Sequence, residues 1–181
     1  MGGEQVSERD FFLPPEGSVI IRGGRVIDPA NGVDEVCDLA VAGGKVAGRG
    51  KALPWSDASK VIDAEGLVVT PGIVDIHNHL YATAGNPNAW AGEYSVFPDG
   101  FSFRSGVTTM VDAGSAGWRN FDLFRVSVIE RSKTRVFAFL NIASFGMIND
   151  IIEQHAPDFD PGTTAEKAKK HREIIVGSKS A

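Results

Sequence analysis

Two histidines separated by one residue are the feature of this sequence with the clearest potential for chemistry. His77 and His79 follow a short, largely apolar run at residues 73–76, which Pro71-Gly72 introduces. Such a run is typical of a buried parallel strand. Because side chains alternate along a strand, both imidazoles and Asp75 are expected on one side of it. Two imidazoles aimed at one point predict a metal site; the alternative is a pair of surface histidines where the strand ends.

The elements around this pair indicate a parallel α/β arrangement. Strands are predicted at residues 73–76, 107–112, 135–141 and 173–179, and helices at 98–104, at 118–131 and from Thr163 or Thr164 to Arg172. Loops are predicted at 81–88 and at 143–161, the second with one helical turn. The strands recur about every 30 to 40 residues, which is the period of a βα-barrel unit.

Other candidate residues also fall where such strands end. Active sites of βα-barrels lie at the carboxyl ends of the strands. Asp112, with the glycine-rich loop at 114–117, and Lys179 occupy such ends. Lysine is a poor metal ligand because its amine is protonated at neutral pH, so Lys179 taken alone is more simply a solvated charge. His155, in a loop, and His171, at a basic helix end, are expected at the surface.

The pattern before residue 71 is different. Residues 1–17 are polar and are expected to form a flexible arm. Short apolar runs then flank Gly23-Gly24, Gly43-Gly44 and residues 64–66, and each of these is predicted to be a hairpin turn. Residues 18–70 are therefore expected to form a small antiparallel β-sandwich domain, followed by an α/β domain at 71–181.

The composition is that of an ordinary globular protein, with 43% hydrophobic residues, 23% charged residues and a mean hydropathy near zero. The net charge of −5 gives no general attraction for nucleic acid or an anionic membrane. Neither a signal-peptide pattern nor an apolar stretch long enough to span a membrane is found. Cys37, the single cysteine, is expected in the core and fits a reducing compartment, so the cytoplasm is predicted.

Two segments in combination resemble the amidohydrolase superfamily. Residues 69–79 (VTPGIVDIHNH) look like its first barrel strand. Residues 106–117 (GVTTMVDAGSAG) resemble the second strand of its dihydroorotase-like amidohydrolase and deacetylase branch. The resemblance runs from about Ser18 to the last residue. It implies an incomplete TIM (β/α) barrel made of the first four strands, preceded by the small β-sandwich.

The same resemblance gives Lys179 a function. Residues 175–179 (IVGSK) are similar to the family's fourth strand, whose lysine is carboxylated by carbon dioxide to a carbamate. It implies His77, His79 and Lys179 as ligands of two divalent metal ions, most simply zinc. Asp75 is expected to orient His77 or its neighbours, and Asp112 is expected to be either structural or a second orienting residue. Two cations about 3.5–4 Å apart need an anion between them, and a bridging carbamate supplies it.

For the whole protein the resemblance implies hydrolysis of cyclic amide, N-acyl or ester bonds of a small molecule by metal-activated hydroxide. The family's base, an aspartate, and two further histidine ligands come from later strands and are expected beyond Ala181. The chain is therefore expected to be the N-terminal part of a larger protein and inactive alone. Four parallel strands leave open edges, so a homo-oligomer or association with the missing C-terminal half is also expected.

Two alternatives stay open. A single-metal deaminase of the same fold uses the His-x-His pair but no carboxylated lysine, so a carbamate on Lys179 separates it from a binuclear hydrolase. A non-catalytic assembly or regulatory homologue is the second alternative. A serine hydrolase is not indicated because Gly-x-Ser-x-Gly does not occur around Ser115, and the P-loop motif is also absent.

Overall fold

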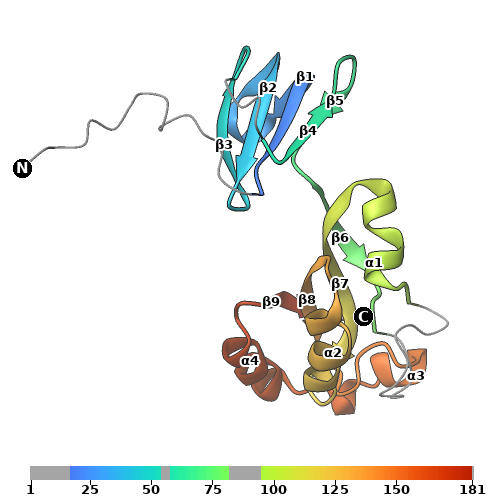
Figure 1. Cartoon of the computed structure of the whole chain (residues 1–181). Coiled ribbons are helices and arrows are strands. Elements are labelled where there is room, and N and C mark those ends of the chain that lie inside the picture. Colours follow the sequence, from blue (N-terminus) through green and yellow to red (C-terminus); the bar gives the residue numbers. More distant parts are fainter. Residues whose placement is uncertain (1–16, 54–57, 82–94, 181) are drawn as a thin grey trace, which may run out of the picture. The chain divides into compact units, whose positions relative to one another are not determined.

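The computed structural model describes residues 17–53, 58–81 and 95–180. The chain divides into two compact units, residues 1–71 and residues 72–181 (Figure 1). The described part of the first unit is built mainly of strands, whereas the second alternates strands with helices.

The described residues of the first unit form one five-stranded sheet. Its strands are β1 (Val19–Asp28), β2 (Val33–Ala42), β3 (Lys45–Gly50), β4 (Lys60–Asp63) and β5 (Val68–Val69). β2 runs antiparallel to both β1 and β3, and Gly43-Gly44 forms the predicted hairpin turn between β2 and β3. Both glycines have a positive φ, 56° and 71°, as the favoured two-residue hairpin turn requires. Cys37 is buried in β2, as predicted.

The other two predicted hairpins are wrong. Gly23-Gly24 lies inside the continuous strand β1, at a shift in its register with β2. A Cβ on Gly24 would lie 2.6 Å from Val69 Cγ2, so this glycine allows β5 to approach β1 closely and does not reverse the chain. Residues 64–66 connect β4 to β5, but these two strands both pair parallel with β1 and do not form a hairpin with each other. The sheet is therefore mixed and not antiparallel as expected.

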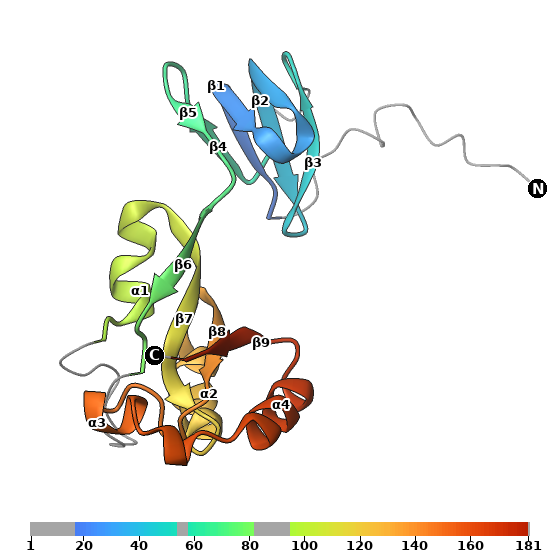
Figure 2. The same ribbon diagram turned by 180° about the vertical axis from the view of Figure 1, so that it is seen from behind.

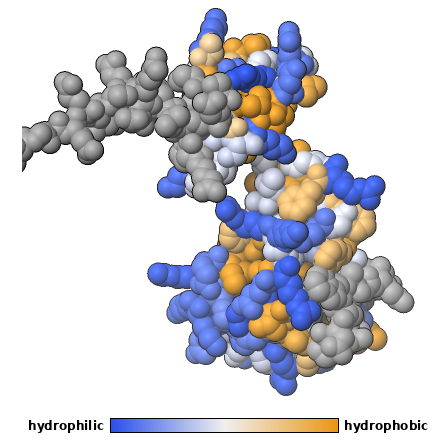
Figure 3. Space-filling model, in the orientation of Figure 1, coloured by the Kyte–Doolittle hydropathy of each residue, from blue (hydrophilic) through white to orange (hydrophobic). Residues whose placement is uncertain are grey.

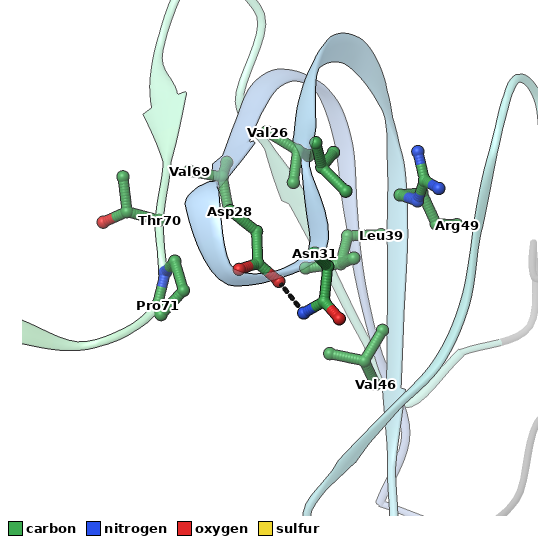
Figure 4. A pocket seen from close by; sticks show the side chains of 10 residues that line it. Val26, Asp28, Asn31, Leu39, Val46, Arg49, Val69, Thr70 and Pro71 are labelled. Carbon is green, nitrogen blue, oxygen red and sulfur yellow. Dashed lines mark hydrogen bonds between the residues drawn. The ribbon is translucent and has the colours of Figure 1, made fainter.

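A pocket of about 520 Å³ opens on this sheet (Figure 4). Apolar side chains such as Val26, Leu39 and Val46 supply much of its lining. Asp28 in the same lining accepts a hydrogen bond from Asn31 Nδ2 at 2.5 Å. None of the residues predicted to bind metal lines this pocket.

The second unit contains a parallel sheet, and helices connect its strands. In sheet order the strands are β6 (Ile73–Asn78), β7 (Val107–Gly117), β8 (Arg135–Asn141) and β9 (Ile175–Lys179). The helices are α1 (Pro98–Phe101), α2 (Phe121–Ser127), α3 (Asp150–Glu153) and α4 (Pro161–Lys170). All strand pairs are parallel, which confirms the predicted α/β alternation (Figure 2). None of the helices in the described part of the chain is long and apolar enough to cross a membrane.

The core of this unit lies between β7, β8 and α2. Phe121 and Phe124 are fully buried, and their rings are 6.2 Å apart. Leu80 and Leu140 are fully buried in the same cluster. The apolar spacing predicted this face of the helix, but α2 is shorter than the range 118–131 predicted for it. The predicted loop at 81–88 lies outside the described residues, apart from Tyr81.

Helix α4 begins before the predicted cap. Asp160 is the N-cap, and its carboxylate accepts hydrogen bonds from Thr163 N at 2.8 Å and Thr163 Oγ1 at 2.6 Å. Pro161 fills the first helical position, where a missing N–H costs nothing. The helix continues to Lys170, and the prediction of a cap at Thr163 or Thr164 is therefore wrong.

The outer strands of the parallel sheet are β6 and β9. Four large apolar side chains on them are between 52% and 67% exposed, namely Ile73, Val74, Ile76 and Val176. Figure 3 shows apolar surface mixed with polar surface on the second unit. The edges of this sheet are therefore partly apolar within the described ranges.

Candidate metal-binding site

The parallel strands bring the predicted residues to one edge of the sheet. His77 and His79 lie at the carboxyl end of β6, and Lys179 ends β9. Between them in the sheet come Ser115 near the end of β7 and Asn141 at the end of β8. Carboxyl ends of parallel strands are the usual place for a site in α/β proteins.

The two histidine rings lie close together in an edge-to-face arrangement. Their centroids are 5.5 Å apart and their planes meet at 87°. His77 is exposed and His79 is half-buried. Burial lowers the pKa of His79, and the nearby positive charges of Lys179 and His77 lower it further. The lowered pKa favours the neutral imidazole of His79, which is the form that binds metal ions, although the charge of Glu153 opposes the shift.

Lys179 extends past Gly114 toward this site. A Cβ on Gly114 would lie 2.7 Å from Lys179 Cδ, and Gly114 has a φ of +88°. The amine Nζ lies 3.5 Å from Glu153 Oε1 and 3.2 Å from Met147 Sδ. The amine therefore has one anionic partner and one sulfur partner, and both belong to the segment after β8.

Glu153 and Asn141 are site residues that the sequence analysis missed. Only 9% of the Glu153 side chain is exposed. Asn141 Nδ2 donates to Glu153 Oε1 at 3.2 Å and to Gly114 O at 3.1 Å, while Asn141 Oδ1 accepts from Ala143 N at 3.0 Å. A polar residue at the carboxyl end of an apolar strand was an available signal for Asn141. Glu153 lies in a predicted loop and carried no such signal.

Asp112 is fully buried in β7 and accepts hydrogen bonds from two backbone segments. Its Oδ2 accepts from Leu80 N at 2.7 Å, and its Oδ1 accepts from Ser115 N at 2.7 Å. Burial raises the pKa of Asp112 to about 6, although hydrogen bonds from Leu80, Ser115 and Gly114 oppose the rise. The carboxylate ties the residue that follows His79 to the end of β7.

The remaining predicted residue, Asp75, contacts the backbone and not an imidazole. Its Oδ1 accepts from His77 N at 3.2 Å. Ser115, which the sequence analysis did not select, does reach an imidazole. Its Oγ lies 3.4 Å from Nδ1 of His79.

The segments at the ends of β7 and β8 pack backbone against backbone. A Cβ on Gly117 would collide with Ala143 O, and a Cβ on Gly146 would lie 2.5 Å from Ser115 O. Met147 N donates to Ser115 O at 3.2 Å. These contacts hold Ser115, which contacts His79, and Met147, which contacts Lys179, in place.

The donor types at this edge fit a divalent metal ion. A neutral imidazole, a second imidazole beside it and a lysine that carboxylation would convert to an oxygen ligand are suitable donors. Within the described ranges, however, no group of three or more His, Cys, Asp or Glu side chains is arranged to hold a metal. The other histidines are elsewhere. His155 is exposed, as predicted, whereas the prediction of a surface position for His171 is wrong.

His171 is buried because the end of α4 packs against α2. Its Nε2 lies 3.1 Å from Asp122 Oδ1, and its ring centroid lies 5.3 Å from that of Phe121. Lys167 Nζ contacts the other oxygen of Asp122 at 2.7 Å. Asp122 of α2 therefore holds Lys167 and His171 at the end of α4, and His171 takes no part in the candidate metal site.

Comparison with known proteins gives the relationship of the chain. No family model matches it. A deacetylase from Agrobacterium fabrum (strain C58) is 38% identical over 148 residues, which are 78% of this chain and 34% of that protein. A dihydroorotase from Geobacter metallireducens is 49% identical over 63 residues, which are 35% of this chain and 15% of that protein. A crystal structure of a dihydroorotase matches with a TM-score of 0.70 and 30% identity, over 91% of this chain and 42% of that one.

The chain is a homologue of deacetylases and dihydroorotases. The resemblance to amidohydrolases that residues 69–79 and 106–117 predicted is thereby confirmed. The structural neighbours of the chain also belong to the amidohydrolase superfamily. The chain spans about a third of the length of the deacetylase that it matches. By homology it is related to hydrolases that act on C–N bonds.

Proposed function

We propose that this amidohydrolase homologue supplies half of a binuclear metal site for the hydrolysis of cyclic amide, N-acyl or ester bonds of small molecules. His77, His79 and Lys179 would hold two divalent metal ions, most simply zinc, with Lys179 carboxylated by carbon dioxide. Asp75 and Asp112 would position the histidine segment. When bound, the metals supply hydroxide at neutral pH by lowering the pKa of water.

One observation carries this proposal. His79 and Lys179, which are 100 residues apart, lie at the same carboxyl edge of a parallel sheet, and the lysine charge is near enough to lower the pKa of the histidine. The 38% identical deacetylase adds support for N-acyl bonds, and the dihydroorotases add support for cyclic amides.

The proposal includes the architecture. The parallel sheet would be the first four strands of a TIM barrel, and the mixed sheet would be part of a small β-sandwich. The catalytic base and the further ligands would come from strands that the described residues do not contain. The chain alone would therefore be inactive, and its open sheet edges would be covered by the remainder of a barrel or by another copy. We also propose a cytoplasmic location, from the single cysteine, which fits a reducing compartment.

Zinc titration of the metal-free chain tests the ligands. We expect His77→Ala and His79→Ala each to raise the zinc Kd by at least about 100-fold, since loss of an orienting partner alone costs 10–100-fold. His155→Ala is the matched control, because His155 is an exposed histidine that is not among the proposed ligands. Zinc binding that survives both site variants would contradict the proposed site.

The carbamate is tested separately. Intact mass in bicarbonate buffer with zinc is expected to show one added carbon dioxide, which Lys179→Met abolishes. Zinc binding through the histidines without a carbamate would favour the single-metal deaminase alternative. Assays of the chain with dihydroorotate and N-acetyl amino acids are expected to show no turnover, and turnover by the purified chain would contradict its proposed inactivity.

A further inference from the structure

Ser115 lies between a buried carboxylate and a site imidazole. Its Oγ is 3.4 Å from His79 Nδ1. Its side chain also helps to lower the pKa of the nearby Asp112 carboxyl group, whose Oδ1 accepts from Ser115 N at 2.7 Å. The side chain of Ser115 is almost fully buried, so bulk water does not compete for these partners.

The chemistry of the partners sets the direction of these hydrogen bonds. An ionised carboxylate only accepts, so the single proton of the Ser115 hydroxyl points to Asp112. The lone pairs of Oγ are then left for His79. A neutral imidazole meets an acceptor with its N–H, so the proton of the His79 ring lies on Nδ1 and the lone pair lies on Nε2.

We propose that Ser115 is a positioning residue that, held by Asp112, keeps the proton of the neutral His79 ring on Nδ1 and presents the Nε2 lone pair to a divalent metal ion. The metal part of this inference rests on the proposed function. The tautomer part does not, because it concerns the metal-free chain. Partners of this kind commonly orient metal-binding histidines in proteins.

The side chain of Ser115 can be removed without disturbing the main contacts of its segment. Ser115 N donates to Asp112, and Ser115 O accepts from Met147 N at 3.2 Å. Both are backbone groups and survive the change Ser115→Ala. The variant therefore tests the role of the Ser115 hydroxyl while the backbone contacts of its segment are retained.

Ser144 offers a matched control on the neighbouring segment. Its backbone N–H donates to Asp158 at 2.7 Å, and its side chain also helps to lower the pKa of Asp158. Ser144 is buried like Ser115, but its carboxylate partner is Asp158 and not Asp112. Among the described residues, no histidine ring forms a hydrogen bond with the hydroxyl of Ser144. Ser144→Ala thus removes the same kind of hydroxyl without the proposed role.

The experiment is ¹⁵N NMR of the imidazole rings in the metal-free chain at pH 8. The sequence has four histidines, and His77→Gln and His155→Gln assist assignment. We expect His79 to show the Nδ1–H tautomer in wild type and in Ser144→Ala. In Ser115→Ala we expect the Nε2–H form to become populated and the zinc Kd to rise about 10-fold or more.

The outcomes separate the two proposals. A wild-type His79 with its proton on Nε2, or a tautomer that Ser115→Ala leaves unchanged, would overturn the inference while leaving the metal site intact. A tautomer that shifts as expected in a chain that binds no zinc would support the role of Ser115 and overturn the proposed function. Loss of zinc binding by both serine variants would indicate general disruption and would also overturn the inference.

Discussion

The Cδ atom of Lys179 fills the space where Gly114 would carry a Cβ. The two residues lie on strands that are not adjacent in the sheet, since β8 runs between β7 and β9. The lysine therefore crosses over a neighbouring strand to reach the histidine side, and it can do so only because residue 114 has no side chain.

Gly114→Ala should consequently damage both the fold and the site. The added methyl group meets Lys179, and the φ of +88° is unfavourable for alanine. We expect the free energy of unfolding to fall by about 1–3 kcal/mol and zinc binding to weaken. Urea denaturation measures the first effect. Gly162→Ala in the first turn of α4, where the nearest atom is 3.4 Å away, is the control and should leave the free energy of unfolding unchanged or raise it by up to about 1 kcal/mol. A Gly114→Ala chain as stable as wild type would contradict the contact.

Asp112→Asn should change how stability depends on pH. Burial raises the pKa of Asp112 to about 6, so the folded chain binds a proton more tightly than the unfolded chain does. The contribution of this group to stability is thus present at acidic pH and falls as pH rises from about 4 to 6. We expect wild type to have a higher free energy of unfolding than Asp112→Asn at pH 4. This difference should shrink by on the order of 3 kcal/mol by pH 7.

Urea unfolding at several pH values measures this gap. Asp63→Asn, at an exposed carboxyl group in the other unit, serves as the control. A gap between wild type and Asp112→Asn that stays constant from pH 4 to pH 7 would show that Asp112 does not titrate in this range.

Asp122→Asn should weaken the junction of α2 and α4. The hydrogen bond from Lys167 is the main cause that lowers the pKa of Asp122. Its contribution to stability is therefore present above the usual carboxyl pKa and is lost as pH falls through the lowered value. Because half of the Asp122 side chain is exposed, we expect a loss of only about 0.5–1 kcal/mol at pH 7, which disappears at strongly acidic pH.

The exposed pair of Arg125 and Glu130 gives the comparison for this variant. Glu130→Gln should cost less than Asp122→Asn, because no buried histidine depends on Glu130. Thermal denaturation of both variants at pH 7 measures the difference, and equal losses would argue against a special role for the α2–α4 pair.

Ile76→Lys should reduce self-association of the chain. Ile76 is 67% exposed on the outer strand β6, and a charged residue on an open edge opposes pairing with another chain. We expect sedimentation velocity to show concentration-dependent association of wild type and less of it for the variant. Ile151→Lys, at an apolar residue that is 82% exposed away from the strands, is the control. A wild-type chain that is monomeric at all concentrations would contradict this expectation.

The sequence predicted the parallel sheet well because apolar runs carry a local signal. The bounds of β8 (Arg135–Asn141) were predicted as observed, since a dense apolar run stands between polar flanks. The convergence of His77, His79 and Lys179 followed from the shared edge of parallel strands, although their role in metal binding stays a prediction.

The errors have a common physical origin in contacts between distant residues. Gly23-Gly24 was read as a turn because nothing local reveals that β5 will lie against Gly24. His171 was assigned to the surface because its basic neighbours face water while its own ring meets Phe121. Glu153 could not be selected, because its partners are Asn141 and Lys179 on two separate strands.

Gly117 and Gly146 limit which loops can be exchanged at this edge of the sheet. Each leaves room for the backbone of the opposite segment, so neither segment can be exchanged for a related sequence without its counterpart. A graft that brings in a new loop after β8 would have to import the matching stretch at the end of β7, and chimaeras that exchange one loop alone are expected to fail because the two backbones collide.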